Sequence, residues 1–209
     1  MKKVLVVFAI CLLGSTLALA TNVSYYTVGQ FSNDVTGAST LNNFPLNSGP
    51  GTSSATISGI LYSDKLSFVG TSATGITPPA TIALGDFDMS GSFLSSSDFS
   101  NVDFNLYVYQ TNPGTGNNDF AGEISGSLGW LGGNLEWQPA NTTFSITAGG
   151  VIDTYTLNNL DGDGDLDLYV NDNPTARLTQ VSAAEPASLL LIGSGLLSLA
   201  GMARRRFFS

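Results

Sequence analysis

The residues of this chain that could do chemistry are concentrated in one acidic stretch, NNLDGDGDLDLYVND at positions 158–172. If its second residue is counted as position 1, oxygen-bearing side chains fall at every second place and glycine stands at position 6, as in a calcium-binding loop. The residues concerned are Asn159, Asp161, Asp163, Gly164, Asp165 and Asp167. Four carboxylates so close together repel one another unless a cation or full hydration screens them. The spacing therefore predicts Ca²⁺ in a structural role, with a solvated acidic turn as the alternative.

The same spacing assigns the ligands. The predicted ligands are the side chains of Asn159, Asp161, Asp163 and Asp167, and Asp165 supplies a backbone carbonyl or an outer-shell charge. Position 12 is Val170, where a helix-loop-helix calcium site has glutamate. Because LDLYV at 166–170 has the composition of a strand, the stretch resembles the β-type aspartate loops of integrin-like repeats.

Histidine and cysteine, the residues of most catalytic constellations, are nearly missing. The chain has no histidine, and its single cysteine, Cys11, lies in the apolar segment at the amino end. Ser-His-Asp and Cys-His sites and imidazole-ligated zinc are therefore excluded. Two of the 16 acids could face each other across a cleft, as in a glycoside hydrolase, but no pair is singled out. The sequence predicts a protein that is not an enzyme.

Aromatic residues give a second candidate site. Trp130 and Trp137 flank a glycine-rich turn and could form a platform on which a sugar ring stacks. Tyr107 and Tyr109 are further stacking candidates. Core filling is the competing interpretation for at least one of the two tryptophans.

These residues are positioned by short strands between glycine-rich turns. In NVDFNLYVYQT at 101–111, apolar residues alternate with polar and tyrosine residues, which is the pattern of a half-buried strand. Similar short segments recur between clusters of Gly, Pro and Asn, and no capped 3.6-residue apolar period interrupts them. Residues 21–181 are therefore predicted to form an all-β domain, an antiparallel β-sandwich of the jelly-roll type.

The amino end has the pattern of a secretory signal peptide at residues 1–20. Lys2 and Lys3 precede an apolar run, and Ala18 and Ala20 form a small-x-small cleavage site before Thr21. The run is far shorter than the roughly 20 residues that span a bilayer. Cleavage after Ala20 would leave a mature chain without cysteine, so its stability must come from core burial or bound ions.

The carboxy end, residues 182–209, contains the longest apolar run. Residues 187–203 would form a helix about 25 Å long, and Arg204, Arg205 and Arg206 follow it directly. By the positive-inside rule these arginines remain cytoplasmic, which leaves the β-domain outside the membrane. The sequence predicts a single transmembrane helix at this end.

The same residues resemble a known signal, the PEP-CTERM sorting domain of Gram-negative bacteria. Glu185 and Pro186, followed by Ala187 and Ser188, match the family's Pro-Glu-Pro-Ala-Ser lead, although Ala184 stands where the family has its first proline. The apolar helix and the three arginines match the rest of the signal. The resemblance implies transient insertion in the inner membrane, recognition by an exosortase-type processing enzyme, and delivery to the cell envelope, surface or extracellular matrix of bacteria that make exopolysaccharide and biofilm.

Charge excludes one class of partner. The net charge is -9, and only Lys65 and Arg177 are basic between Thr21 and Glu185, so a phosphate backbone cannot be neutralised and nucleic acid is excluded. We expect a non-enzymatic surface or matrix protein, associated with biofilm or exopolysaccharide. A calcium-dependent carbohydrate-binding module is the alternative, and a carboxylate-based glycoside hydrolase is a weaker one.

Overall fold

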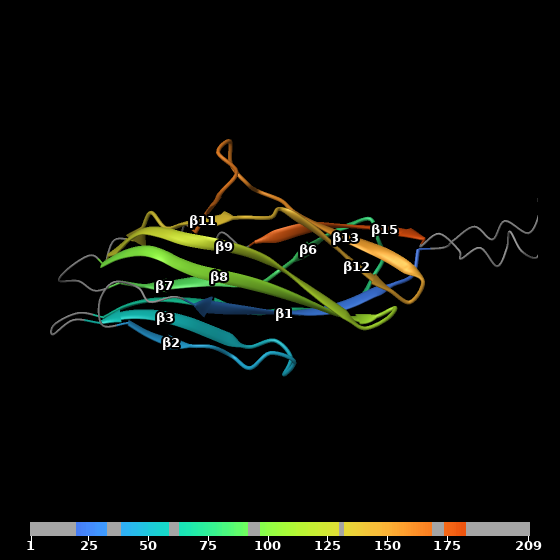
Figure 1. Cartoon of the computed structure of the whole chain (residues 1–209), viewed down its shortest axis with the longest axis horizontal. Helices are drawn as coiled ribbons and strands as arrows, with labels where there is room; N and C mark the ends of the chain where they lie inside the picture. Colours follow the sequence, from blue (N-terminus) through green and yellow to red (C-terminus); the bar gives the residue numbers. More distant parts are fainter. Residues whose placement is uncertain are drawn as a thin grey trace, which may run out of the picture.

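The computed structural model describes residues 20–32, 39–58, 63–91, 97–129, 132–168 and 174–182, which form strands and loops with no helix among them (Figure 1). Each strand pair in these ranges is antiparallel. The prediction of an all-β, antiparallel fold is therefore confirmed, and the sheets are layered as in a sandwich.

Three sheets make up the domain. The largest contains β1 (Val23–Ser32), β5 (Ser72–Ile76), β8 (Ser97–Asn112), β9 (Gly116–Gly129), β10 (Gly132–Gly133), β11 (Glu136–Pro139) and β14 (Leu166–Asp167). Its order is β14-β11-β9-β8-β1-β5, and β10 pairs with β9. A four-stranded sheet, in the order β2-β3-β4-β7, contains β2 (Ser39–Asn42), β3 (Thr52–Ser58), β4 (Ser63–Val69) and β7 (Asp86–Ser90). The other, in the order β12-β13-β15-β6, contains β6 (Ala80–Ala83), β12 (Thr143–Ala148), β13 (Val151–Leu157) and β15 (Thr175–Ser182).

The alternation in β8 gives the large sheet an inner and an outer face. Its inner residues, which are fully buried, are Val102, Phe104, Leu106 and Val108. The residues between them point to the opposite face because successive side chains of a strand alternate. The period-2 pattern in the sequence therefore predicted this face correctly.

Phe104 lies at the centre of an aromatic cluster between the large sheet and the β2-β3-β4-β7 sheet. Its ring centroid is 4.9 Å from that of Phe31, 5.2 Å from Phe68, 5.0 Å from Phe87 and 5.5 Å from Trp137. Phe31 and Trp137 belong to the same sheet as Phe104, whereas Phe68 and Phe87 come from β4 and β7. These ring contacts hold the two sheets together.

A second group of rings joins the large sheet to the β12-β13-β15-β6 sheet. Phe120 of β9 lies 4.5 Å from Phe144 of β12, and Phe144 lies 5.2 Å from Tyr155 of β13. The inner face of the large sheet is thus covered by both smaller sheets. The described members of this core fall between Val23 and Leu178, within the segment from residue 21 to 184.

A buried polar network crosses this second junction. Gln110 donates from Nε2 to Asp153 Oδ2 at 2.8 Å, and the Tyr155 hydroxyl donates to Gln110 Oε1 at 2.9 Å. Gln180 donates from Nε2 to Asp153 Oδ1 at 2.8 Å. Asp153 is fully buried, and burial raises its pKa, while the two amide donors act in the opposite direction. Both of its oxygens are therefore satisfied by neutral amide groups.

The two terminal predictions lie almost wholly outside the described residues. Only Ala20 of the predicted signal peptide is described, and the carboxy-terminal helix at 187–203 and the arginines after it are not. In the part of the chain that the structure describes, no helix is long and apolar enough to cross a membrane.

Gly29 of β1 has no room for a larger side chain. A Cβ atom there would overlap the rings of Phe68 and Phe104, which are fixed in the aromatic cluster. We expect Gly29→Ala to lower the free energy of unfolding by about 1–3 kcal/mol, as measured by urea denaturation of the 21–184 segment. Gly162→Ala is the control because a Cβ there meets nothing within 4 Å, so its effect should stay within about 0.5 kcal/mol. Equal unfolding midpoints for the two variants would contradict the packing described here.

Candidate functional site

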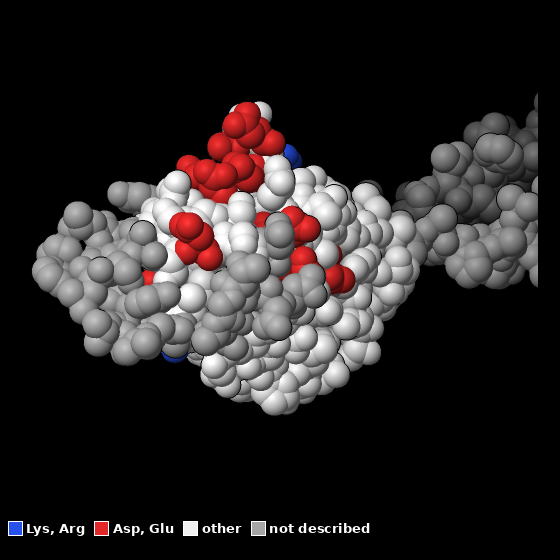
Figure 2. All heavy atoms as spheres, turned by 60° about the vertical axis from the view of Figure 1, so that its left-hand side comes forward, with Lys and Arg blue, Asp and Glu red and all other residues white. Residues whose placement is uncertain are grey.

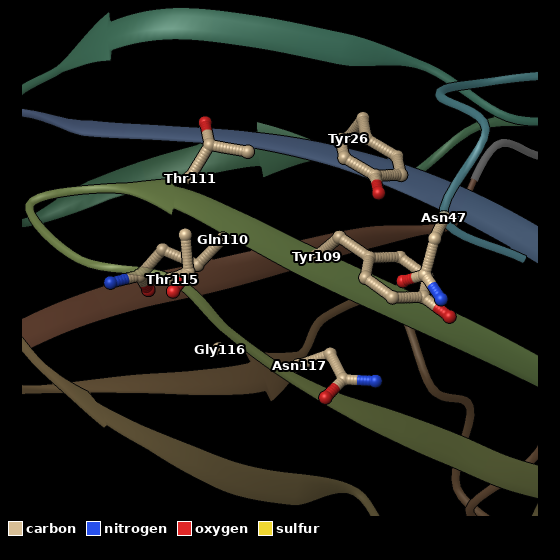
Figure 3. Close-up of a pocket in the computed structure, with 8 residues that line it drawn as sticks. All are labelled: Tyr26, Asn47, Tyr109, Gln110, Thr111, Thr115, Gly116 and Asn117. Atoms are coloured by element: carbon tan, nitrogen blue, oxygen red, sulfur yellow. The ribbon is translucent and has the colours of Figure 1, made fainter.

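The outer face of the large sheet carries a pocket built by strand register. Tyr26 of β1 lies opposite Tyr109 of β8, and Tyr109 lies opposite Asn117 of β9, so the three side chains stand side by side. Figure 3 shows them with Asn47, which reaches in from the loop before β3. The pocket has a volume of about 320 Å³ and is lined by Tyr26, Asn47, Tyr109, Gln110, Thr111, Thr115, Gly116 and Asn117.

The two tyrosine rings form a parallel stack. Their centroids are 4.9 Å apart and their planes differ by 9°. Tyr109 is 6% exposed, and Tyr26 is half-buried. Burial raises the pKa of the Tyr109 phenol, and a side-chain hydrogen bond with Asn117 acts in the opposite direction. At neutral pH Tyr109 is therefore an uncharged group that can donate and accept hydrogen bonds.

The loop that carries Asn47 is attached to β1 at several points. Asn43 accepts a hydrogen bond from the Phe31 amide at 2.9 Å and donates to the Phe31 carbonyl at 2.7 Å. The Ser53 hydroxyl donates to the Gly29 carbonyl at 2.6 Å. Asn47 itself has a φ of 63°, a left-handed conformation that asparagine tolerates better than most residues. Local sequence and anchoring together place this amide at the pocket.

One lining residue, Gln110, is tied to the buried interior. Gln110 is 2% exposed, and its amide is committed on both sides to the network of Asp153 and Tyr155. The residues described as lining the pocket offer rings, amides and hydroxyls, and none of them is an acid. This set suits the hydroxyl groups and ring faces of a neutral ligand, and it lacks the carboxylate pair of a glycoside hydrolase.

The same outer face also carries carboxylates away from the pocket. Asp119 lies opposite Tyr107, and its charge contributes to the raised pKa of Tyr109. Further along, Asp103 lies opposite Glu123. In Figure 2 the acidic atoms gather on the protruding segment between β13 and β14, and further acidic groups lie on the surface below it. This face therefore repels anionic ligands.

The acidic loop between β13 and β14 is organised around Asp161. Its Oδ1 accepts backbone N–H bonds from Asp163 at 2.9 Å, Gly164 at 3.1 Å and Asp165 at 3.4 Å. The Asp163 bond is the main cause that lowers the pKa of Asp161. Gly164 has a φ of 89°, the left-handed conformation that glycine adopts without strain. The turn glycine predicted from the spacing is therefore in a turn conformation.

Asp165 is the unusual member of this loop. It is 9% exposed, and its Oδ1 is buried without a hydrogen-bond partner. Its pKa is raised to about 6, first by close approach to the Asp161 carboxyl, then by burial and by the charges of Asp161, Glu136 and Asp163. Glu136 belongs to β11, which pairs with β14, so strand pairing brings it to the loop. The sequence motif gave no signal for Glu136, which lies outside it.

The other predicted ligands are more dispersed. Asp163 and Asp167 are exposed, and Asp167 lies opposite Glu136 in the sheet. Asn159 is exposed with a φ of 61°, and its Nδ2 donates to Thr175 Oγ1 at 3.5 Å. Within the described ranges, no three acidic, histidine or cysteine side chains converge as a metal-ion site would require. The structure thus brings Asp161 and Asp165 together and leaves the remaining carboxylates apart.

Trp137 has no exposed surface for the sugar-stacking platform predicted from the sequence. Trp137 is fully buried against Phe87 and Phe104, and its Nε1 is buried without a hydrogen-bond partner. It fills the core, which the sequence favoured for at least one tryptophan, and it has no ring face free for a sugar. Trp130 lies outside the described residues. Of the predicted stacking residues that the structure describes, Tyr107 and Tyr109 lie on the outer face of the large sheet.

Comparison with known proteins adds no relative. No family model matches the chain, and no match was found among curated proteins or solved structures.

Proposed function

We propose that this chain is an exported, non-enzymatic protein of the cell surface or extracellular matrix, and that its β-domain binds polysaccharide at the Tyr26–Tyr109 pocket. The observation that carries the proposal is the composition of the pocket. Two stacked rings lie beside amides and hydroxyls, and no acid is among the described lining residues. The half-buried Tyr26 ring, which packs against the buried Tyr109 ring, can stack on the apolar face of a sugar, and the amides exchange hydrogen bonds with the sugar hydroxyl groups.

The ligand class follows from charge. The net charge of the chain is -9, and acids such as Asp119 flank the pocket. A polysaccharide rich in uronic acids or sulfates would be repelled. The preferred ligand is therefore a neutral polysaccharide, or one whose sugars carry free amines.

Delivery to the cell surface or extracellular matrix is assigned to the two ends of the sequence. The small-x-small site at Ala18 and Ala20 supports export. The Glu185-Pro186 lead, the apolar run and the arginines support sorting by an exosortase-type enzyme in a Gram-negative envelope. In this proposal the carboxy-terminal helix holds the chain in the inner membrane transiently, and the β-domain, a jelly-roll-like sandwich, folds outside.

A calcium-dependent form of the same activity is the second candidate. It is favoured by the buried, unpartnered Oδ1 of Asp165 in contact with a second carboxyl, because a cation between two carboxylates removes both their repulsion and the unsatisfied oxygen. The proposed ligands remain Asn159, Asp161, Asp163 and Asp167, with Asp165 and Glu136 adding charge at the base of the loop. Calcium would shape the loop and take no part in a reaction.

Polysaccharide binding is tested with matched asparagine variants. We expect the 21–184 segment to bind neutral or amine-bearing glycans on an array, with or without chelator, and to leave uronic-acid polymers unbound. Asn117→Ala should weaken binding about 3- to 10-fold through the loss of one hydrogen bond, and Tyr26→Ala should weaken it by a similar factor through lost stacking. The control is Asn105→Ala, because Asn105 lies on the outer face of β8 but does not line the pocket.

Three outcomes of that experiment would contradict the proposal. These are binding to no glycan, equal binding by Asn117→Ala and Asn105→Ala, and release of reducing ends from a bound polysaccharide. Binding that disappears with chelator would favour the calcium-dependent candidate over the calcium-independent one.

Calcium binding is tested by thermal unfolding. An ion that binds only the folded state stabilises it by mass action, so calcium at about ten times its dissociation constant should raise the melting temperature by about 3–6 °C. Extracellular sites of this kind often bind at about 0.1–1 mM, and magnesium should do much less because it holds its water tightly. Asp163→Ala should abolish the rise, and Asp98→Ala, an exposed acid outside the loop, should preserve it. An identical melting temperature in excess calcium and in excess chelator would make the loop a solvated turn.

A further inference from the structure

The first residue after the expected cleavage site is held by the end of the last described strand. The Thr21 nitrogen donates to Gln180 Oε1 at 2.7 Å, and Gln180 Nε2 donates back to the Thr21 carbonyl at 3.2 Å. The two residues are 159 positions apart, so this contact joins the two ends of the domain. Thr21 and its backbone nitrogen are thus fixed in position by a side-chain amide.

The same amide reaches a buried carboxylate. Gln180 Nε2 also donates to Asp153 Oδ1 at 2.8 Å, and Asp153 is fully buried. Its other oxygen accepts from Gln110 at 2.8 Å. The Thr21 nitrogen is therefore one amide group away from a carboxylate whose hydrogen bonds come from neutral donors.

A nearby positive charge would stabilise the ionised form of such a carboxylate. Burial raises the pKa of Asp153, which means that its ionised form is poorly solvated. In the uncleaved chain the Thr21 nitrogen is a neutral peptide N–H. After cleavage it is an ammonium group at neutral pH, with more hydrogens to donate.

We propose that removal of the leader creates a charge pair between the new α-ammonium group of Thr21 and the buried carboxylate of Asp153, bridged by Gln180, which stabilises the mature domain relative to its precursor. The step is hydrolysis of the Ala20–Thr21 peptide bond: water supplies the hydroxyl to the Ala20 carbonyl carbon and a proton to the Thr21 nitrogen. The new Ala20 carboxyl group then releases its proton, and protonation of the Thr21 amine gives the ammonium group. The inference rests on the export in the proposed function. Processing then strengthens the fold at the point where the leader was attached.

The sequence allows this charge to be removed by chemistry alone. Lys65 is the only lysine between residues 21 and 184, and it is exposed on β4. In a Lys65→Arg version of the segment that begins at Thr21, acetylation therefore modifies only the α-amino group. The acetylated chain keeps an N–H to donate to Gln180 but loses the positive charge.

We expect acetylation to lower the melting temperature of that segment by about 2–4 °C at pH 6, and to have no such effect when Asp153→Asn is added. An equal fall in melting temperature with and without Asp153→Asn, or no fall in either case, would overturn the charge pair. If Asp153→Asn does not fold, the α-amine pKa measured by NMR decides: a value above the usual range of about 7.7–8.0 supports the pair, and a value within or below it contradicts it.

Failure of the charge pair can be told apart from failure of the proposed function. Glycan binding by the same samples does not depend on acetylation. Intact-mass measurement of the protein from its native host should show a chain that begins at Thr21 and ends near Glu185-Pro186. A chain that begins elsewhere would overturn the role of processing, and one that retains its last residues would contradict exosortase-type cleavage while leaving the charge pair in place.

Discussion

The pairing register of β8 with its two neighbours is the constraint on which the rest of the molecule depends. β8 pairs with β1 on one side and β9 on the other. A shift of one residue would turn Phe104 out of the aromatic cluster and would turn Tyr109 from the outer to the inner face. Because the inner face is filled by rings that touch both smaller sheets, the core selects one register. The same register then places Tyr26, Tyr109 and Asn117 side by side outside.

Burial and internal hydrogen bonds hold this arrangement in the described residues. The span from 21 to 182 contains no cysteine, so no disulfide can stabilise it. The aromatic cluster around Phe104 joins the large sheet to one smaller sheet, and the network of Gln110, Asp153 and Tyr155 lies at the junction with the other. Gln110 belongs to that network and is also among the residues that line the pocket. The candidate site is therefore supported directly by the buried interior.

Local pattern was enough to predict the strands, the antiparallel class and the turn glycine, because each depends on a few consecutive residues. Tyr109 was also among the predicted stacking residues. Tyr26 and Asn47 were not, because a pairing between β1 and β8 and a loop anchored on β1 bring them to the pocket. Glu136 likewise reaches the acidic loop through the pairing of β11 with β14. Such long-range pairings leave no mark in local spacing.

Polysaccharide binding at the stacked tyrosines is tested most directly by NMR of aromatic ring resonances during titration with a bound glycan. We expect the resonances of Tyr26 and Tyr109 to shift together as the glycan concentration increases. The ring resonances of Phe68 and Phe87, which pack together in the core and do not line the pocket, should stay unchanged and serve as internal controls. Binding that leaves Tyr26 and Tyr109 unshifted would contradict the account and place the ligand elsewhere on the domain.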